Sequence, residues 1–221
     1  MLFIFDLDGT LLDTVDDLAA AVNHALATVG LPPRTREEVG SFLGNGIRVL
    51  VTKSLANRVD ADKAEQAFAA FKSYYLNHCL DFTRPYEGIM PLLQELHRQG
   101  HQAAIVSNKL DPAVKSLNTR FFAPLITLAI GEGAPMPGRS AETVRRKPCP
   151  DALHAVMQTL HTNAEDTLYI GDTEVDILTA QAAGVSCISV SWGFRSVAEL
   201  QAAGATTLIH RPAELLSFLP R

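Results

Sequence analysis

The sequence predicts an α/β protein with a doubly wound, mainly parallel sheet and an inserted all-helical domain. Beyond residue 88, helical patterns alternate with short apolar runs, and repeated β-α-β units of this kind require right-handed crossovers and a parallel sheet. The first apolar run, Leu2 to Phe5, lacks polar alternation, as expected of a strand covered on both faces. Residues 15–80 show helical patterns alone, which indicates an insertion after the first strand.

The first predicted strand ends at two carboxylates, Asp6 and Asp8, which are followed by Gly9 and Thr10. In open α/β sheets, ligands bind beyond the carboxyl ends of the strands, and residues two apart on a strand point to the same side. Asp6 is therefore a candidate nucleophile that forms an aspartyl-phosphate, with Asp8 as general acid and base. The alternative is an ordinary Asp-Gly turn at a strand end.

The insertion is predicted to contain three helices. Their apolar residues recur at helical spacing over residues 15–29, 47–57 and 61–77. Thr14 and Asp17 are expected to cap the first helix, and Gly30 with the prolines after it ends that helix. Residues 81–88 form the expected return linker. The predicted domains are therefore an α/β core of residues 1–14 and 81–221 and a helical domain of residues 15–80.

The rest of the core is predicted to alternate strands and helices. The expected strands cover residues 103–106, 125–130, 167–170, 185–190 and 206–209. The expected helices cover residues 89–98, 112–121, 151–160, 175–183, 197–203 and 213–219. Residues 131–146 are rich in glycine and proline and are expected to form an irregular crossover, in which no helix or strand is predicted.

Two later clusters lie at positions that such a sheet would bring to the end of the first strand. Ser107 and Asn108 come directly after an apolar strand, so that a hydroxyl and backbone N–H groups can bind phosphoryl oxygens. A turn or helix cap is the alternative for this pair. Lys147 precedes Pro148, and a fixed ammonium there would neutralise charge on a nucleophile and a phosphoryl group. The alternative for Lys147 is a solvated basic loop.

A third cluster places Asp172 and Asp176 after the strand at residues 167–170. Several carboxylates that converge on a phosphate would repel it unless a cation lay between them. Mg²⁺ meets this need because it is a hard ion that binds carboxylate, carbonyl and phosphate oxygens. The expected protein ligands are Asp6, the carbonyl of Asp8 and Asp172. Capping of the helix that follows is the alternative for this cluster.

Composition limits the classes of partner. The chain has 221 residues, 47% of them hydrophobic, and a formal net charge of −5, which argues against a nucleic-acid or anionic membrane surface. The sequence contains no apolar run long enough for a membrane helix. The amino terminus also lacks a basic region before its apolar run, so we expect a cytoplasmic protein. The three cysteines form no C-x-x-C motif and are expected to be reduced thiols. The sequence leaves open whether it is a monomer or a homodimer.

Together, the motifs D-L-D-G-T, S-N, K-P and G-D-x-x-x-D resemble those of the haloacid dehalogenase-like phosphatase superfamily, in the same order and element context. The resemblance implies a Rossmann-like core with a mobile helical cap that closes over the site and excludes water. It also implies Mg²⁺ as cofactor, a small phosphoester as substrate, and a phosphate-binding role for the polar groups of the motifs. The implied roles are nucleophile for Asp6, acid and base for Asp8, substrate binding for Thr10, Ser107 and Asn108, charge stabilisation for Lys147, metal binding for Asp172 and support for Asp176.

Within the superfamily, the chain is most similar to bacterial phosphoglycolate phosphatases. The similarity rests on D-L-D-G-T-L-L-D-T, Leu43 to Arg48, Gly171 to Asp176, and Ser191 to Arg195. It implies a phosphomonoester hydrolase that acts on 2-phosphoglycolate. A pyrophosphatase, or a sugar-phosphate phosphatase or mutase, remains an alternative on the same core, and a non-catalytic binding protein is a third class.

Specificity is expected to come from the helical domain, because the core motifs contact only the phosphoryl group. Gly44 and Gly46 precede a predicted helix, so backbone N–H groups can approach an anion there, and Arg48 in the first turn can make a bidentate contact with a carboxylate. The alternative is a glycine-containing turn between two helices, with Arg48 in solvent.

Overall fold

The computed structural model describes residues 1–136 and 139–219. The chain divides into two compact units, one formed by Met1–Leu11 with Pro85–Arg221 and the other by Leu12–Arg84. The helical unit thus begins at Leu12, not at residue 15, and ends at Arg84, not at residue 80. The shift has a physical cause, because two short strands of the linkers, β2 (Leu12–Asp13) and β3 (Arg84–Pro85), pair with each other.

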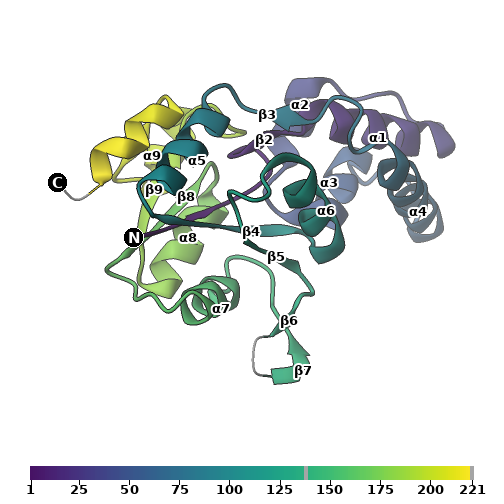
Figure 1. Cartoon of the computed structure of the whole chain (residues 1–221). Helices are drawn as coiled ribbons and strands as arrows, with labels where there is room; N and C mark the ends of the chain where they lie inside the picture. The colour runs from purple at the N-terminus through teal and green to yellow at the C-terminus, as the bar shows by residue number, and fades with distance from the viewer. Residues whose placement is uncertain (137–138, 220–221) are drawn as a thin grey trace. The chain divides into compact units, whose positions relative to one another are not determined.

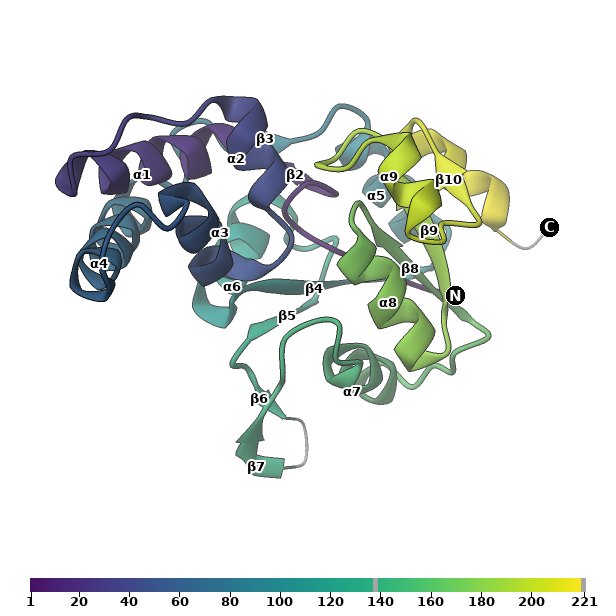
Figure 2. The same cartoon turned by 180° about the vertical axis from the view of Figure 1, so that it is seen from behind.

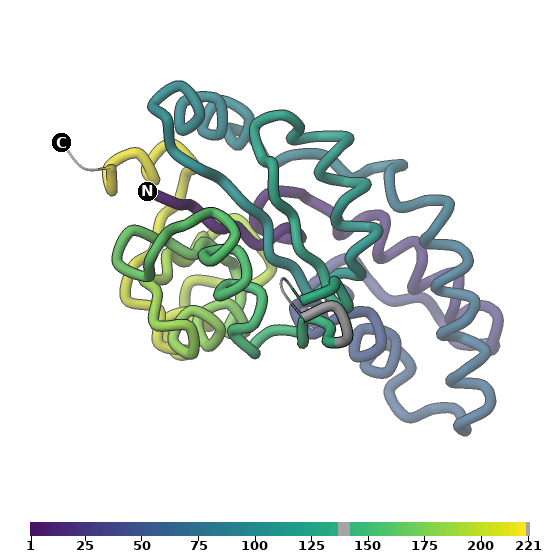
Figure 3. Tube along the Cα trace, turned by 60° about the horizontal axis from the view of Figure 1, so that its bottom comes forward, coloured from purple at the N-terminus to yellow at the C-terminus, as the bar shows by residue number. Residues whose placement is uncertain are grey.

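Six strands form the sheet of the first unit, in the spatial order β10 (Leu208–Ile209), β9 (Ser186–Val190), β8 (Thr167–Gly171), β1 (Leu2–Phe5), β4 (Gln102–Leu110) and β5 (Leu128–Glu132). Every neighbouring pair is parallel. All four residues of β1 are fully buried or nearly so, because β1 lies between β4 and β8 and both of its faces are covered. Figure 3 shows this purple strand running through the middle of the unit. The predicted doubly wound α/β fold is confirmed.

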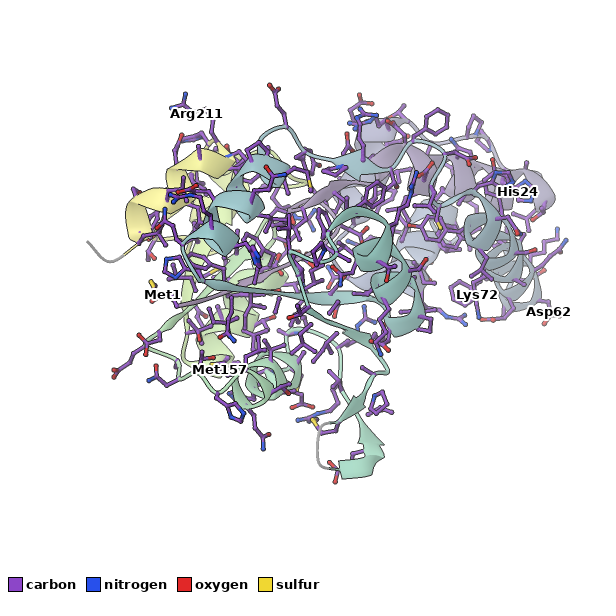
Figure 4. All side chains as sticks on the ribbon, in the orientation of Figure 1. Met1, His24, Asp62, Lys72, Met157 and Arg211 are labelled. Carbon is purple, nitrogen blue, oxygen red and sulfur yellow. The ribbon has the colours of Figure 1, made fainter. Side chains whose placement is uncertain are left out.

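Helices cover both faces of this sheet (Figure 1). They are α5 (Ile89–Arg98), α6 (Asp111–Phe121), α7 (Asp151–Thr159), α8 (Glu174–Ala183), α9 (Val197–Ala202) and the 3₁₀ helix η1 (Pro212–Phe218). Helices α7 and α8 pack on the face that carries Leu2, Ile4 and Tyr169. Met157 of α7, labelled in Figure 4, belongs to the same apolar cluster. This packing fixes the ends of the strands, where the motif residues lie.

Residues 131–146 contain a short hairpin that the glycine and proline content did not indicate. Strands β6 (Pro135–Met136) and β7 (Arg139–Thr143) pair antiparallel, and Val144 donates its backbone N–H to the carbonyl of Ala134 at 2.8 Å. Both of these residues are buried, so apolar contacts anchor the base of the hairpin. Figure 2 shows the hairpin projecting from the rest of this unit. Residues 137 and 138 of the predicted crossover lie outside the described residues.

The second unit consists of the helices α1 (Val15–Thr28), α2 (Arg36–Phe42), α3 (Gly46–Leu55) and α4 (Ala61–His78), with α1 packed along α4. The sequence reading missed α2, although its signal was present. Thr35 accepts a hydrogen bond from the backbone N–H of Glu38, whose carboxylate accepts one from the N–H of Thr35. This capping box is a known mark of a helix start. Among the described residues, no helix combines the length and apolar character that a membrane span requires.

The predicted capping pair at the start of α1 was wrong. Thr14 makes no side-chain capping bond, and the buried carboxylate of Asp17 accepts hydrogen bonds from the backbone N–H groups of Phe82 and Thr83, at 3.0 and 2.9 Å. Those two donors lie in the return linker, so Asp17 binds the linker to α1. Buried N–H groups need a partner, and a carboxylate with two free oxygens satisfies both at once.

Candidate active site

The carboxyl ends of three adjacent strands carry the polar motifs. Asp6 follows β1, Ser107 and Asn108 lie in β4, and Asp172 follows β8. Because β1 lies between β4 and β8, these residues share one edge of the sheet. Oxygen atoms of Asp6, Asp172 and Asp176 all lie within 4.8 Å of one another, and the three side chains are buried.

Lys147 is the buried cation of this acidic cluster. Its Nζ atom lies 2.9 Å from Oδ1 of Asp6 and 2.7 Å from Oδ1 of Asp176, and the side chain is only 3% exposed. Burial by itself would lower the pKa of Lys147, but the two carboxylates outweigh that effect and raise it. Lys147 therefore stays charged between two acids, in contrast to a solvated loop lysine.

Asn108 holds the backbone of Lys147. Its Nδ2 group donates to the carbonyl of Lys147 at 3.2 Å, and its Oδ1 atom accepts from the N–H of Lys147 at 2.7 Å. The substrate-binding role expected of Asn108 stays a prediction, and its side-chain amide is used for these two contacts with Lys147. A bidentate amide fixes both backbone groups of Lys147 and thereby the direction of the ammonium group.

We expect Asn108→Ala to lower the free energy of unfolding by about 2–3 kcal/mol, because it leaves two buried backbone groups without their partner. It should also lower kcat, since Lys147 loses its fixed position. Denaturant titration and steady-state kinetics measure the two effects.

The matched control is Asn23→Ala. Asn23 makes the same bidentate contact with Arg34, at 3.1 and 2.8 Å, but in the helical unit. It should cost stability and leave kcat unchanged. An equal loss of kcat in both variants would contradict a positioning role for Asn108.

Asp176 is bound on both carboxylate oxygens. Its Oδ1 atom accepts from Lys147 and from the hydroxyl of Tyr169 at 2.9 Å, and its Oδ2 atom accepts from the N–H and the hydroxyl of Thr173 at 3.0 and 2.8 Å. Burial would raise the pKa of Asp176, but Lys147 and these donors hold it below its usual value. Tyr169 also accepts a hydrogen bond from Lys147 at 2.9 Å, a connection that the sequence reading missed.

Asp172 lies in a close-fitting cradle of backbone. The hydroxyl of Thr10 donates to its Oδ1 atom at 2.9 Å, and the N–H of Phe194 donates to its Oδ2 atom at 2.8 Å. A Cβ atom at Gly9 or at Gly193 would come within 2.3 Å of the Asp172 side chain, so only glycine fits at either position. Thr10 was expected to bind substrate, and the structure shows its hydroxyl on Asp172.

The cluster carries more negative charge than Lys147 can compensate. Burial raises the pKa of Asp6 to about 7 despite Lys147, and burial with the nearby Asp176 raises that of Asp172 well above its usual range. Hard oxygen donors with such excess charge fit a divalent cation. Because Asp176 is saturated by protein donors, Asp6 and Asp172 are the acids best able to serve as ligands.

Asp8 and Ser107 both contact Lys109, which the sequence reading did not single out. Oδ1 of Asp8 lies 2.8 Å from Nζ of Lys109, and Oγ of Ser107 accepts the backbone N–H of Lys109 at 3.1 Å. Lys109 directly follows the polar pair Ser107 and Asn108, which was the available signal. The predicted strand at 103–106 is longer in the structure and includes all three residues.

Gly44, Gly46 and Arg48 belong to the helical unit. Both glycines have positive φ, 100° and 75°, a conformation that favours glycine. Arg48 in the first turn of α3 forms an ion pair with Glu65, and its guanidinium carbon lies 3.7 Å from the ring centroid of Phe68. Its side chain is 54% exposed, so Arg48 is oriented by its neighbours while still facing solvent.

The sequence matches the model of the haloacid dehalogenase-like hydrolase family over residues 3–190. The chain belongs to this family. The match includes every residue of the acidic cluster and the whole helical unit. The cluster of Asp6, Lys147, Asp172 and Asp176 is thus the candidate active site of a haloacid dehalogenase-like hydrolase.

Known relatives of this hydrolase are phosphatases. The phosphoglycolate phosphatase 1 of Pseudomonas aeruginosa is 36% identical over 97% of this chain and 78% of the relative, and a phosphoglycolate phosphatase of Pseudomonas fluorescens strain Pf0-1 is 38% identical over 90% and 73%. A crystal structure from Lactobacillus delbrueckii, which carries a provisional phosphoglycolate phosphatase name, has a TM-score of 0.91 and 34% identity over 100% of this chain and 98% of that one. This hydrolase is therefore an enzyme of the phosphatase type.

Proposed function

We propose that this hydrolase is a magnesium-dependent phosphomonoesterase that acts through an aspartyl-phosphate, with 2-phosphoglycolate as its substrate. One observation carries the proposal: the buried carboxylate of Asp6 lies at the end of the central strand, 2.9 Å from the ammonium of Lys147. A carboxylate held in this way is a competent nucleophile for phosphorus. The phosphoglycolate phosphatase names of the relatives support the choice of substrate.

In the proposed reaction, an oxygen of Asp6 attacks the phosphorus, and the bond from phosphorus to the ester oxygen breaks. Asp8 gives its proton to the departing alkoxide, which leaves as an alcohol. Asp8 then takes a proton from a water molecule as that water attacks the aspartyl-phosphate, so inorganic phosphate leaves and both acids return to their first state. Lys147 and Ser107 stabilise the negative charge on the phosphoryl oxygens.

Asp6, Asp172 and the backbone carbonyl of Asp8 would hold Mg²⁺. When bound, the ion supplies positive charge that offsets the charges of the phosphate and of the carboxylates around it. The bonds from Thr10 and Phe194 keep Asp172 oriented for this task. Asp176 pairs with Lys147 and would contribute by holding that ammonium group in place.

A panel of phosphate substrates compared by kcat/KM tests the proposed substrate. We expect the highest value for 2-phosphoglycolate and lower values for pyrophosphate, sugar phosphates and an aryl phosphate. A maximum on pyrophosphate would identify a pyrophosphatase, and conversion of a sugar phosphate without phosphate release would identify a mutase. Either result would overturn 2-phosphoglycolate as the substrate. Neither would decide whether Asp6 is the nucleophile, which Asp6→Asn tests separately.

For the helical unit, we propose that Arg48 with the turn at Gly44 and Gly46 recognises the carboxylate of the substrate. Arg48→Ala should lower kcat/KM for carboxylate-bearing phosphoesters by about 1.5–3 kcal/mol, the range of a charged hydrogen bond, and barely affect an aryl phosphate without a carboxylate. Steady-state kinetics on both substrate types measure the difference.

The matched control for Arg48 is Lys72→Ala. Lys72, labelled in Figure 4, is a second cation on the same ring, with Nζ 5.7 Å from the centroid of Phe68. Lys72→Ala should leave kcat/KM unchanged for both substrate types. Equal losses on both substrate types in Arg48→Ala, or no loss on either, would mean that specificity depends on other residues.

A further inference from the structure

We propose that Lys109 is the positioning residue of the acid and base, holding the carboxylate of Asp8 in the direction that proton transfer requires. The inference rests on the proposed phosphomonoesterase function, but not on the choice of 2-phosphoglycolate as substrate. It gives the site two lysines with different tasks. Lys147 pairs with Asp6 and Asp176, whereas Lys109 pairs with Asp8.

Burial shows that Lys109 is no ordinary surface lysine. Its side chain is 6% exposed, and lysine is almost never buried to this extent unless it is paired. Its Nζ atom lies 2.8 Å from Oδ1 of Asp8, whose own side chain is 18% exposed. The Asp8 side chain thus keeps some exposed surface while its Oδ1 atom is paired with a buried ammonium.

An irregularity in the sheet explains how Lys109 reaches this position. The register between β4 and β5 shifts between Val106 and Leu110, and the three residues Ser107, Asn108 and Lys109 are all buried. Helices cover this sheet on both faces, so consecutive residues of β4 can all be buried, and a shift in register redirects the side chains of the residues within it. Lys109 lies within this shift, and its Nζ atom reaches Asp8 just beyond the end of β1.

The backbone of Lys109 is fixed as well. Its N–H donates to Oγ of Ser107 at 3.1 Å, and a Cβ atom on Gly131 would come within 2.6 Å of its carbonyl oxygen. The neighbouring strand therefore packs directly against this peptide. Holding a lysine side chain in one place costs conformational entropy. Because the backbone of Lys109 is already fixed, the ion pair has to order only the side chain.

A positioned carboxyl group contributes to catalysis only if its oxygen reaches the reacting proton. Asp8 alone can rotate about its side-chain bonds. With Oδ1 paired to Lys109, Oδ2 would be the oxygen that transfers the proton to the leaving group. Loss of Lys109 should therefore act like partial loss of Asp8, and its effect should depend on how much the leaving group needs a proton.

The test is the leaving-group dependence of kcat/KM in Lys109→Met. For an alkyl phosphate such as ethyl phosphate, we expect a loss of about 100-fold, since an alkoxide cannot leave without protonation. For p-nitrophenyl phosphate, whose leaving group needs no proton, we expect a loss of less than about fivefold. Equal losses on both substrates would overturn the proposal, because they would indicate general damage to the site.

A double-mutant cycle gives a second readout. In an Asp8→Asn background, Lys109→Met should cost little further kcat/KM for the alkyl phosphate, because both changes remove the same function. Full additivity would overturn the proposal. Lys109→Arg, which keeps the charge, should retain more of the alkyl-phosphate activity than Lys109→Met, and it keeps the comparison available if the Met variant folds poorly.

Lys115→Met is the matched control. Lys115 pairs with Asp111 at 2.6 Å on α6, and its side chain is 59% exposed. This variant removes a lysine–aspartate pair of the same unit and should leave the ratio of the two kcat/KM values unchanged.

A crystal structure of Lys109→Met tests the positioning directly, without activity. We expect the Asp8 carboxylate to turn away or to occupy two conformers, and a carboxylate in its original place would overturn the proposal. Failure of the wild-type enzyme to prefer 2-phosphoglycolate would overturn only the proposed substrate, because the kinetic test uses ethyl and p-nitrophenyl phosphate.

Discussion

Asp6→Asn should abolish turnover and leave the fold intact. An amide of the same shape is a poor nucleophile, so we expect kcat to fall by about 1,000-fold or more on every phosphate substrate. The expected effect is this large because Asp6 would form the covalent intermediate, and its neighbours cannot replace it. Asp172 is bound by Thr10 and Phe194, and Asp176 is bound by Lys147.

The same substitution should not lower the thermal midpoint of the metal-free protein. Burial raises the pKa of Asp6 to about 7, which means that its negative charge is costly where it lies. Asparagine removes that charge and keeps an oxygen for the N–H of Leu7, which now donates to Oδ1 at 2.7 Å. The loss of attraction to Lys147 is offset by reduced repulsion from Asp172 and Asp176. Thermal unfolding in chelator measures the balance.

Asp111→Asn is the control for replacing a buried acid of the same unit. Asp111 accepts the N–H of Gly131 at 3.0 Å and pairs with Lys115, outside the acidic cluster. It should lower stability and retain most of the turnover. A well-folded Asp6→Asn protein that keeps more than a few per cent of the wild-type kcat would exclude Asp6 as the nucleophile.

The sheet could be predicted from the sequence because its central strands are buried on both faces. Runs such as Leu2 to Phe5 are apolar at every position, and that pattern does not depend on any distant residue. The ends of the strands were equally clear, since an apolar run that stops at Asp6 or at Asp172 marks an edge of the sheet. The meeting of these acids then follows from the parallel order of the strands.

The partners of individual side chains could not be predicted in the same way. Asn108 binds the backbone of Lys147, a residue 39 positions away, and Lys109 binds Asp8, 101 positions away, from a part of β4 where the register shifts. Neither contact leaves a local pattern. The same holds for Asp17, whose expected partner was Thr14 and whose actual partners lie in the return linker.

Three short elements with little apolar pattern, α2, β6 and β7, were also not predicted. Helix α2 has seven residues, of which Val39 alone is buried, so its apolar periodicity is weak. Its capping box was the better signal. Strands β6 and β7 lie in a segment whose glycines and prolines indicate turns, and such short strands have little sequence pattern of their own.

Removal of divalent metal should abolish activity, and addition of Mg²⁺ should restore it. The reason is the excess of negative charge: three buried carboxylates lie within 4.8 Å of one another beside one ammonium, and a phosphate dianion must still enter. Without a cation, this repulsion opposes binding of any phosphoester. Activity assays in chelator, followed by titration with Mg²⁺, measure the effect. Ca²⁺ should support activity poorly, because its coordination shell is larger and looser.

Metal binding should also stabilise the fold, which gives a readout that does not depend on turnover. At a Mg²⁺ concentration about 100 times its dissociation constant, binding to the native state contributes about 2.7 kcal/mol, which raises the thermal midpoint by about 5–10 °C. Asp172→Asn is the decisive variant, since it removes the proposed ligand, against whose side chain Gly9 and Gly193 pack closely. It should lose most of this rise, whereas Asp111→Asn should keep it. Full activity in chelator, or an equal rise in both variants, would exclude Asp172 as a metal ligand of a magnesium-dependent site.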